Sequence, residues 1–121
     1  MLTAGVATWR AWLQAGGTAP ALMAGHSLGE YTALVCAGAL NFSDAVSLVS
    51  DRARFMQQAV PEGEGAMAAI LGLDDDEVTT LCQQNAAGEV LQAVNYNAPG
   101  QVVVAGSAAA VGRLVDNAKA A

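Results

Sequence analysis

The sequence predicts a mixed α/β fold in two parts, and two patterns of residues carry that prediction. In residues 1–60, helical spacing dominates, and a Gly-His-Ser-Leu-Gly pentapeptide at residues 25–29 stands between a short apolar run and a helix. In residues 61–121, the expected order is strand, helix, strand, strand, helix. That order is a split βαβ unit without its final strand, so we expect a boundary near residue 60.

The first part predicts three helices and one strand. Val6, Trp9 and Leu13 lie at helical spacing, and Gly16 with Gly17 supplies a left-handed stop. The apolar run before the pentapeptide is too short for a helix and fits a buried strand. The expected elements are helices over residues 2–15, 30–37 and 43–58 and a strand over residues 21–24.

The second part carries two capping signals. Asp74 and Ser107 each precede a helical pattern, and both residue types are favoured at helix N-caps. The expected elements are strands over residues 66–71, 90–95 and 101–105, a turn over 96–100, and helices over 74–85 and from 107 to the end. The last pattern reaches Ala121 without a capping glycine, so we interpret the chain as an internal piece of a larger domain.

Composition excludes several classes of function. With 54% hydrophobic and 13% charged residues the chain is not disordered, and its apolar excess predicts faces covered by further chain. A net charge of −6 argues against nucleic acid or an anionic membrane as partner. Cys36 and Cys82 show no metal-binding or redox spacing. We therefore expect no metal. The sequence shows no membrane span and no secretory signal, so we expect a cytoplasmic location.

The pentapeptide is a G-x-S-x-G nucleophile elbow. Its two glycines permit a strained turn that exposes the Ser27 hydroxyl, and the Leu28 N–H then faces any oxyanion that forms. The competing interpretation is an ordinary glycine-rich turn. His26 is the only histidine. It is either the base for Ser27 or, as we prefer, a supporting residue on the substrate-binding side, because adjacent elbow residues point apart.

Arg52 lies within the apolar stripe of the third predicted helix, between Val49 and Phe55. A buried arginine needs an anionic partner. That partner is either an internal carboxylate, such as Glu30 or Asp51, or the carboxylate of a substrate. Spacing alone leaves both open, whereas Arg54 lies about 200° further round the helix and is expected to face solvent.

Residues 25–31 (GHSLGEY) resemble the active-serine motif of malonyl-CoA:acyl carrier protein transacylases and polyketide acyltransferase domains. The resemblance continues through residues 33–38, 52–63, 65–70 and 95–103, and is strongest to the free-standing bacterial type. It implies part of an α/β-hydrolase-like acyltransferase domain (residues 1–60) with an incomplete ferredoxin-like subdomain, βαββα (residues 61–121). Ser27 would carry the malonyl ester, Leu28 would give half the oxyanion hole, and Arg52 would bind the malonyl carboxylate.

The implied activity is ping-pong transfer of malonyl from coenzyme A to serine and then to the phosphopantetheine thiol of acyl carrier protein, in fatty acid biosynthesis. These thioesters are substrates, and no bound cofactor is implied. The family's other oxyanion donor and its downstream histidine base have no counterpart here. We therefore expect this chain alone to be nearly inactive, because loss of such a base costs on the order of 10⁶ in rate.

Three alternatives remain open. An α/β-hydrolase esterase would use the same elbow but gives Arg52 no role. A piece of a multidomain polyketide or fatty-acid synthase would share the motifs. A truncated product that folds poorly or only binds a partner would follow from uncovered apolar faces.

Overall fold

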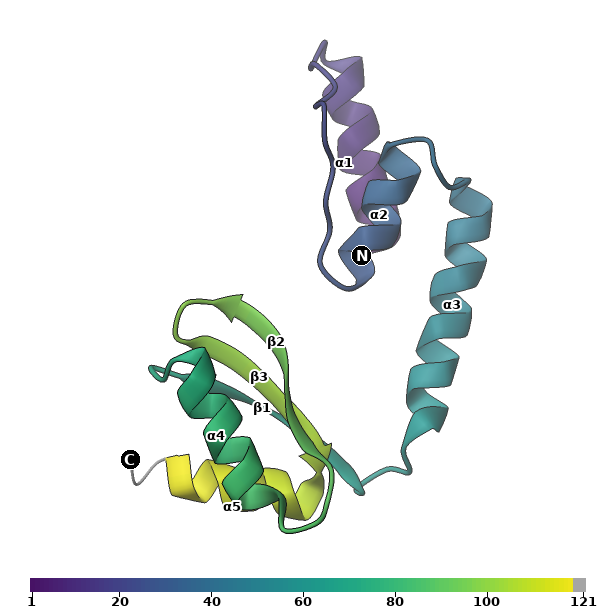
Figure 1. The fold of residues 1–121 in the computed structure, drawn as a ribbon. Coiled ribbons are helices and arrows are strands. Elements are labelled where there is room, and N and C mark those ends of the chain that lie inside the picture. Colours follow the sequence, from purple (N-terminus) through teal and green to yellow (C-terminus); the bar gives the residue numbers. More distant parts are fainter. Residues whose placement is uncertain (119–121) are drawn as a thin grey trace. The chain divides into compact units, whose positions relative to one another are not determined.

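The computed structural model describes residues 1–118, and the chain divides into two compact units, one over Met1–Gln58 and one that begins at Ala59 (Figure 1). The helical pattern predicted for residues 119–121 lies outside the described residues. Within residues 1–118, no helix has the length and apolar character that a membrane crossing requires.

The first unit consists of three helices, as predicted: α1 (Leu2–Gln14), α2 (Leu28–Cys36) and α3 (Phe42–Ala59). Gly16 follows α1 with a φ of +82°, the left-handed stop that the paired glycines predict. Three buried side chains form the core of this unit, Leu2 and Val6 from α1 and Ala45 from α3. Half-buried residues close around them: Tyr31, Val35, Cys36, Leu40, Phe42 and Val49.

The strand predicted over residues 21–24 is absent, and this prediction is wrong. The segment between α1 and α2 pairs with no strand among the described residues, and Leu22 is 89% exposed. An apolar run becomes a strand only when a neighbour takes up its backbone hydrogen bonds. No described segment offers that neighbour, so the run is a loop that leads into the turn before α2.

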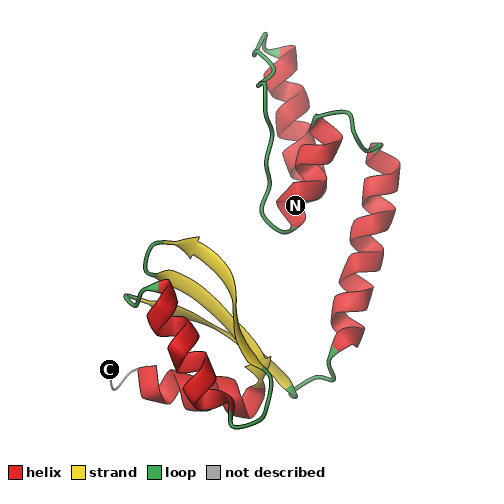
Figure 2. Cartoon of the chain, viewed as in Figure 1, coloured by secondary structure: helices red, strands yellow, loops and turns green. Residues whose placement is uncertain are grey.

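The second unit is a three-stranded antiparallel sheet with two helices, in the chain order β1 (Gly65–Leu71), α4 (Asp75–Ala86), β2 (Leu91–Ala98), β3 (Gln101–Ser107) and α5 (Ala108–Ala118). This confirms the predicted βαββα order. The strands lie in the order β1-β3-β2, and α4 and α5 pack on one face of the sheet (Figure 2). The core lies between them and includes the fully buried Val78, Val102, Val104 and Leu114.

Both predicted helix caps are present. The Asp74 carboxylate accepts from the Glu77 N–H at 2.8 Å, and the Glu77 carboxylate accepts from the Asp74 N–H at 2.8 Å, which completes a capping box. The Ser107 hydroxyl accepts from the Ala110 N–H at 3.2 Å. The predicted turn over residues 96–100 is too long, because β2 continues to Ala98 and pairs there with Gln101.

The carboxyl end of α4 is held by side chains of α5. Arg113 donates to the main-chain oxygens of Asn85 and Ala86, each at 3.1 Å, and pairs with Glu89 at 2.5 Å. The Asn117 amide donates to the Asn85 side-chain oxygen at 2.5 Å. The two bonds to main-chain oxygens satisfy carbonyls that a helix end leaves without intrahelical partners. Hydrogen bonds from Arg113 and then Ser107 hold the pKa of Glu89 below its usual range.

We predict that Glu89→Gln destabilises the second unit at neutral pH. A carboxyl whose folded-state pKa is lowered stabilises the fold above its unfolded-state pKa, near the ordinary 4.5. That stabilisation is lost as the pH falls through the lower folded-state value. Hydrogen exchange of the buried Val102 and Val104 amides is the measurement, and the gap between variant and wild type should close in acid. Glu62→Gln, at an exposed linker position, is the control, and a gap that persists in acid would contradict the prediction.

Candidate active site

Ser27 occupies a sharp turn directly before α2. Its φ of 53° and ψ of −117° lie in a region that residues other than glycine rarely adopt, and α2 begins at the next residue, Leu28. The side chain is exposed. A strained, exposed serine at the start of a helix is the geometry that the G-x-S-x-G pattern predicts.

The turn depends on one of its two glycines for space. A Cβ on Gly25 would lie 2.0 Å from the carbonyl carbon and oxygen of Gly29, because the chain folds back on itself there. A Cβ on Gly29 would meet no described atom within 4 Å. Of the two glycines that the sequence suggests permit the turn, Gly25 sits where the described backbone closes on itself, and Gly29 does not.

The backbone N–H of Leu28, directly after Ser27, has no acceptor in the described structure. The Gly29 N–H donates to the His26 oxygen at 2.9 Å, and the Glu30 N–H donates to the Ser27 oxygen at 3.2 Å. First-turn N–H groups of a helix carry partial positive charge, so the Leu28 N–H is available to an anionic oxygen that forms beside Ser27.

Arg52 reaches the serine from α3. Its Nη2 donates to Ser27 Oγ at 2.9 Å, across 25 residues of sequence and inside the first unit. Arg52 is half-buried. The sequence singled out both residues but not their contact, because a helical period places Arg52 on a face without saying what that face meets.

The internal carboxylate partners considered for Arg52 are not used. Arg54 pairs with Asp51 at 2.8 Å, and no ion pair of Arg52 occurs among the described residues. The Arg54 side chain is 60% exposed, which confirms its predicted solvent-facing position. Arg52 is therefore a cation whose partner is a neutral hydroxyl, and this leaves it able to receive an anion.

The apolar stripe around Arg52 is less buried than predicted. Ala45 is fully buried and Val49 half-buried, but Leu48, Phe55 and Met56 are 46%, 61% and 60% exposed. The amino-terminal half of α3 packs on α1 and α2, and the half that bears Arg52 shows its apolar side chains to solvent. An amphipathic pattern predicts which residues share a face but not whether a partner covers it.

The remaining chemically active groups of the described residues are a histidine and two cysteines. His26 is exposed and precedes Ser27 on the turn. Both cysteines are free thiols, and burial raises the pKa of Cys36 and Cys82. Among residues 1–118, no group of three or more potential metal ligands occurs. The described residues thus concentrate nucleophile, cation and free N–H at one elbow.

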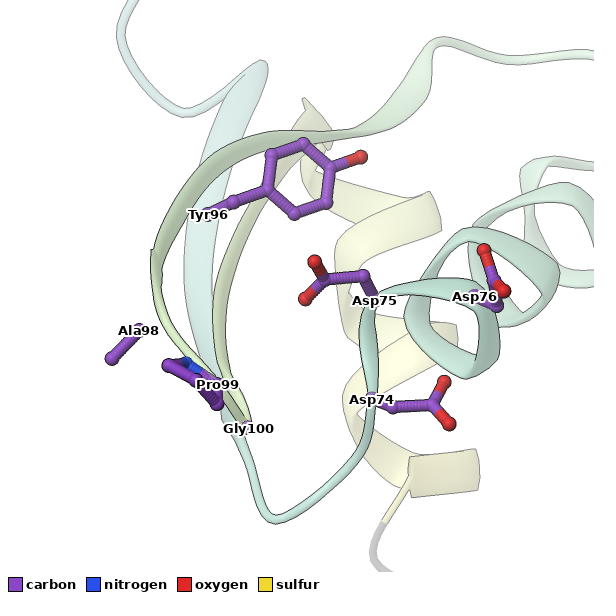
Figure 3. Close-up of a pocket in the computed structure, with 7 residues that line it drawn as sticks. All are labelled: Asp74, Asp75, Asp76, Tyr96, Ala98, Pro99 and Gly100. Atoms are coloured by element: carbon purple, nitrogen blue, oxygen red, sulfur yellow. The ribbon is translucent and has the colours of Figure 1, made fainter.

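The second unit contains a hollow of about 610 Å³ whose lining includes neither Ser27 nor Arg52 (Figure 3). Its lining combines the start of α4 with the β2–β3 hairpin: Asp74, Asp75, Asp76, Tyr96, Ala98, Pro99 and Gly100. The Asp74 carboxylate is already engaged in the capping box. The hollow offers acidic groups but no nucleophile activated by a base, so the elbow remains the candidate site.

A serine on a strained turn with a helix start behind it is typical of the proteins that pass an acyl group through a serine at a nucleophile elbow, and here an arginine lies on its hydroxyl. The family model described as "Acyl transferase domain" matches residues 1–121. The chain belongs to the acyl transferase domain family.

Similar proteins place it more narrowly. It is 60% identical to the malonyl CoA-acyl carrier protein transacylase of Salmonella typhimurium, across 100% of this chain and 39% of that protein. An acyl-carrier-protein S-malonyltransferase from Burkholderia pseudomallei superposes with a TM-score of 0.95 at 58% identity, covering 98% of this chain and 39% of that one. A malonyl-transacylase in complex with a type II polyketide acyl-carrier protein superposes with a TM-score of 0.94 at 55% identity, covering 98% of this chain and 38% of that one. The chain thus spans about two fifths of the length of these relatives.

We predict opposite effects for alanine at the two elbow glycines. Gly25→Ala should destabilise the first unit by about 1–3 kcal/mol, since backbone must move to admit the methyl group. Gly29→Ala, inside α2 with space around it, should be neutral or stabilising by up to about 1 kcal/mol. Urea unfolding followed by tryptophan fluorescence measures this, because Trp9 and Trp12 both lie in the first unit. Equal effects at the two positions would contradict it.

Proposed function

We propose that this chain carries the nucleophile and the carboxylate-binding group of an [acyl-carrier-protein] S-malonyltransferase. The observation that supports this most directly is the 2.9 Å hydrogen bond from Arg52 Nη2 to Ser27 Oγ. A nucleophile and a guanidinium this close address one small substrate at two points. Such a substrate needs a carbonyl carbon for Ser27 and a carboxylate for Arg52.

The separation of these two groups favours a malonyl group. In malonyl the two carbonyl carbons are separated by one methylene, about 2.5 Å apart by standard bond lengths. Ser27 Oγ must approach the thioester carbon to roughly 3–3.5 Å while the carboxylate stays on Arg52. In an acyl group that is longer by one methylene, the carboxylate lies further from the reacting carbon, and it then fits less well on an Arg52 guanidinium that contacts Ser27 Oγ. An acetyl group leaves the guanidinium without an anion.

The proposed first half-reaction is acyl transfer to Ser27. A bond forms between Ser27 Oγ and the malonyl carbonyl carbon, the carbon–sulfur bond breaks, and the hydroxyl proton ends on the coenzyme A thiol. The Leu28 N–H is placed to donate to the oxyanion of the tetrahedral intermediate. Arg52 has no acceptor atom and cannot take the serine proton. In this proposal His26 supports the site, and the base is a histidine from elsewhere in the enzyme, as the resemblance implies.

The second half-reaction gives the chain its partner. The phosphopantetheine thiol of acyl carrier protein attacks the serine ester and leaves with the malonyl group, which supplies fatty acid biosynthesis. The relatives named for this activity, and the transacylase whose structure includes an acyl-carrier protein, support that assignment. Both thiols enter as substrates, and the proposed reaction uses neither a metal nor a resident cofactor. In this proposal the enzyme works in the cytoplasm.

An esterase acting on uncharged esters is the weaker candidate. It would use Ser27 and Leu28 in the same way, but it gives no reason for a half-buried guanidinium on the serine hydroxyl. Holding a cation there without an anionic partner costs free energy, which a substrate carboxylate recovers.

We predict a slow, stoichiometric malonyl adduct on Ser27 when the chain is incubated with malonyl-CoA. Ser27→Ala should abolish the adduct, because the accepting oxygen is gone. Arg52→Ala should slow its formation by about 10- to 100-fold, the range for loss of charge-assisted hydrogen bonds. Intact-protein mass spectrometry measures each rate.

Arg54→Ala is the matched control, since Arg54 lies two residues away on the same helix and pairs with Asp51. It should leave the rate unchanged. Acetyl-CoA should give a much slower adduct than malonyl-CoA. The proposal fails if acetyl-CoA acylates as fast as malonyl-CoA, or if the adduct survives Ser27→Ala.

A further inference from the structure

We propose that the Ser27 hydroxyl and the substrate carboxylate compete for Arg52, so that arrival of the carboxylate releases the nucleophile. This inference rests on the proposed function and adds a step to it. Arg52 would then select malonyl twice, once by binding its carboxylate and once by holding Ser27 back when no carboxylate is present. The basis is the bond from Arg52 Nη2 to Ser27 Oγ in the unacylated chain.

The hydroxyl stands where an anion is expected. Arg52 is half-buried, and no carboxylate pairs with it among the described residues. Arg54, on the same helix, has Asp51 as its anion. A guanidinium withdrawn from water takes the best acceptor within reach, and here that acceptor is the neutral oxygen of Ser27. The Ser27 hydroxyl thus substitutes for the missing charge.

A carboxylate is the stronger acceptor for the same group. Hydrogen bonds between ionised partners are shorter and roughly twice as strong as neutral ones, and a carboxylate engages a guanidinium through two parallel bonds. The Nη2 atom that now donates to Ser27 belongs to the fork that such a pair uses. Entry of the malonyl carboxylate therefore displaces the hydroxyl from Arg52.

Release matters for reactivity. A serine oxygen has two lone pairs, and one of them accepts from Nη2 while Arg52 holds it. The guanidinium draws electron density from that oxygen and fixes its orientation toward α3. An uncharged acyl group such as acetyl leaves this bond intact. Malonyl breaks it, and the freed Oγ attacks the thioester carbon to form the tetrahedral intermediate. The carbon–sulfur bond of that intermediate then breaks, and the serine proton ends on the coenzyme A thiol.

Competition makes a prediction that needs no catalysis. If Ser27 occupies the carboxylate site, removing its hydroxyl must tighten the binding of free malonate. We expect Ser27→Ala to lower the Kd of malonate by about 3- to 10-fold, the equivalent of one hydrogen bond. The Kd is measured from the NMR shift of the Arg52 Nε–H during titration with sodium malonate, with chloride holding the ionic strength constant.

Three further variants keep the test decisive. Ser27→Gly removes the same hydroxyl and suits the positive φ at this position, so it reports even if the alanine variant folds poorly. Its Kd should fall in the same way. Arg54→Ala should bind malonate as the wild type does, and Arg52→Ala, followed through the Leu28 N–H shift, should not bind it.

The outcomes separate this inference from the proposed function. If the serine variants bind malonate no more tightly than the wild type, while Arg52→Ala abolishes binding, the competition is overturned and the carboxylate role stands. If Arg52→Ala binds malonate as well as the wild type does, or no variant binds it, both proposals are overturned.

Discussion

The close approach of Gly25 to the backbone of Gly29 is the constraint on which the site depends. Without a side chain at residue 25 the chain turns within three residues and forces Ser27 into its strained backbone conformation. The same turn starts α2 at Leu28, so this one turn positions both the Ser27 hydroxyl and the Leu28 N–H. Arg52 then needs only the correct face of α3 to meet the hydroxyl. A substitution that opens the turn separates all three groups at once.

Local signals in the sequence predicted the parts of the fold that local bonds determine. The caps at Asp74 and Ser107 are made within three residues of themselves, and the elbow is closed by its own backbone, so each is readable from a short stretch. The strand over residues 21–24 and the buried stripe of α3 depend on partners distant in sequence, and those predictions failed. The contact between Ser27 and Arg52 is also non-local, which is why sequence suggested two important residues but not that they touch.

Two arginines on α3 show how position decides the role of one residue type. Arg54 is mostly exposed, pairs with the neighbouring Asp51 and stacks its guanidinium 5.4 Å from the centre of the Phe55 ring. Such an exposed pair contributes little to stability. Arg52 is half-buried and bonds to a serine instead of to an acid. The first arrangement satisfies its charge within the helix, and the second leaves a charge to be satisfied by a ligand.

The two units also differ in how much core holds them. Three buried apolar side chains, Leu2, Val6 and Ala45, support the unit with the elbow, whereas the described part of the sheet unit, up to Ala118, buries nine. Opening free energies differ across a structure, and regions with little buried apolar surface open first. We therefore expect the unit with the elbow to open at a lower free energy than the sheet unit. A melting curve dominated by the sheet unit reports the unfolding of that unit alone. Two preparations with the same melting curve can therefore differ in the fraction of molecules whose elbow is folded.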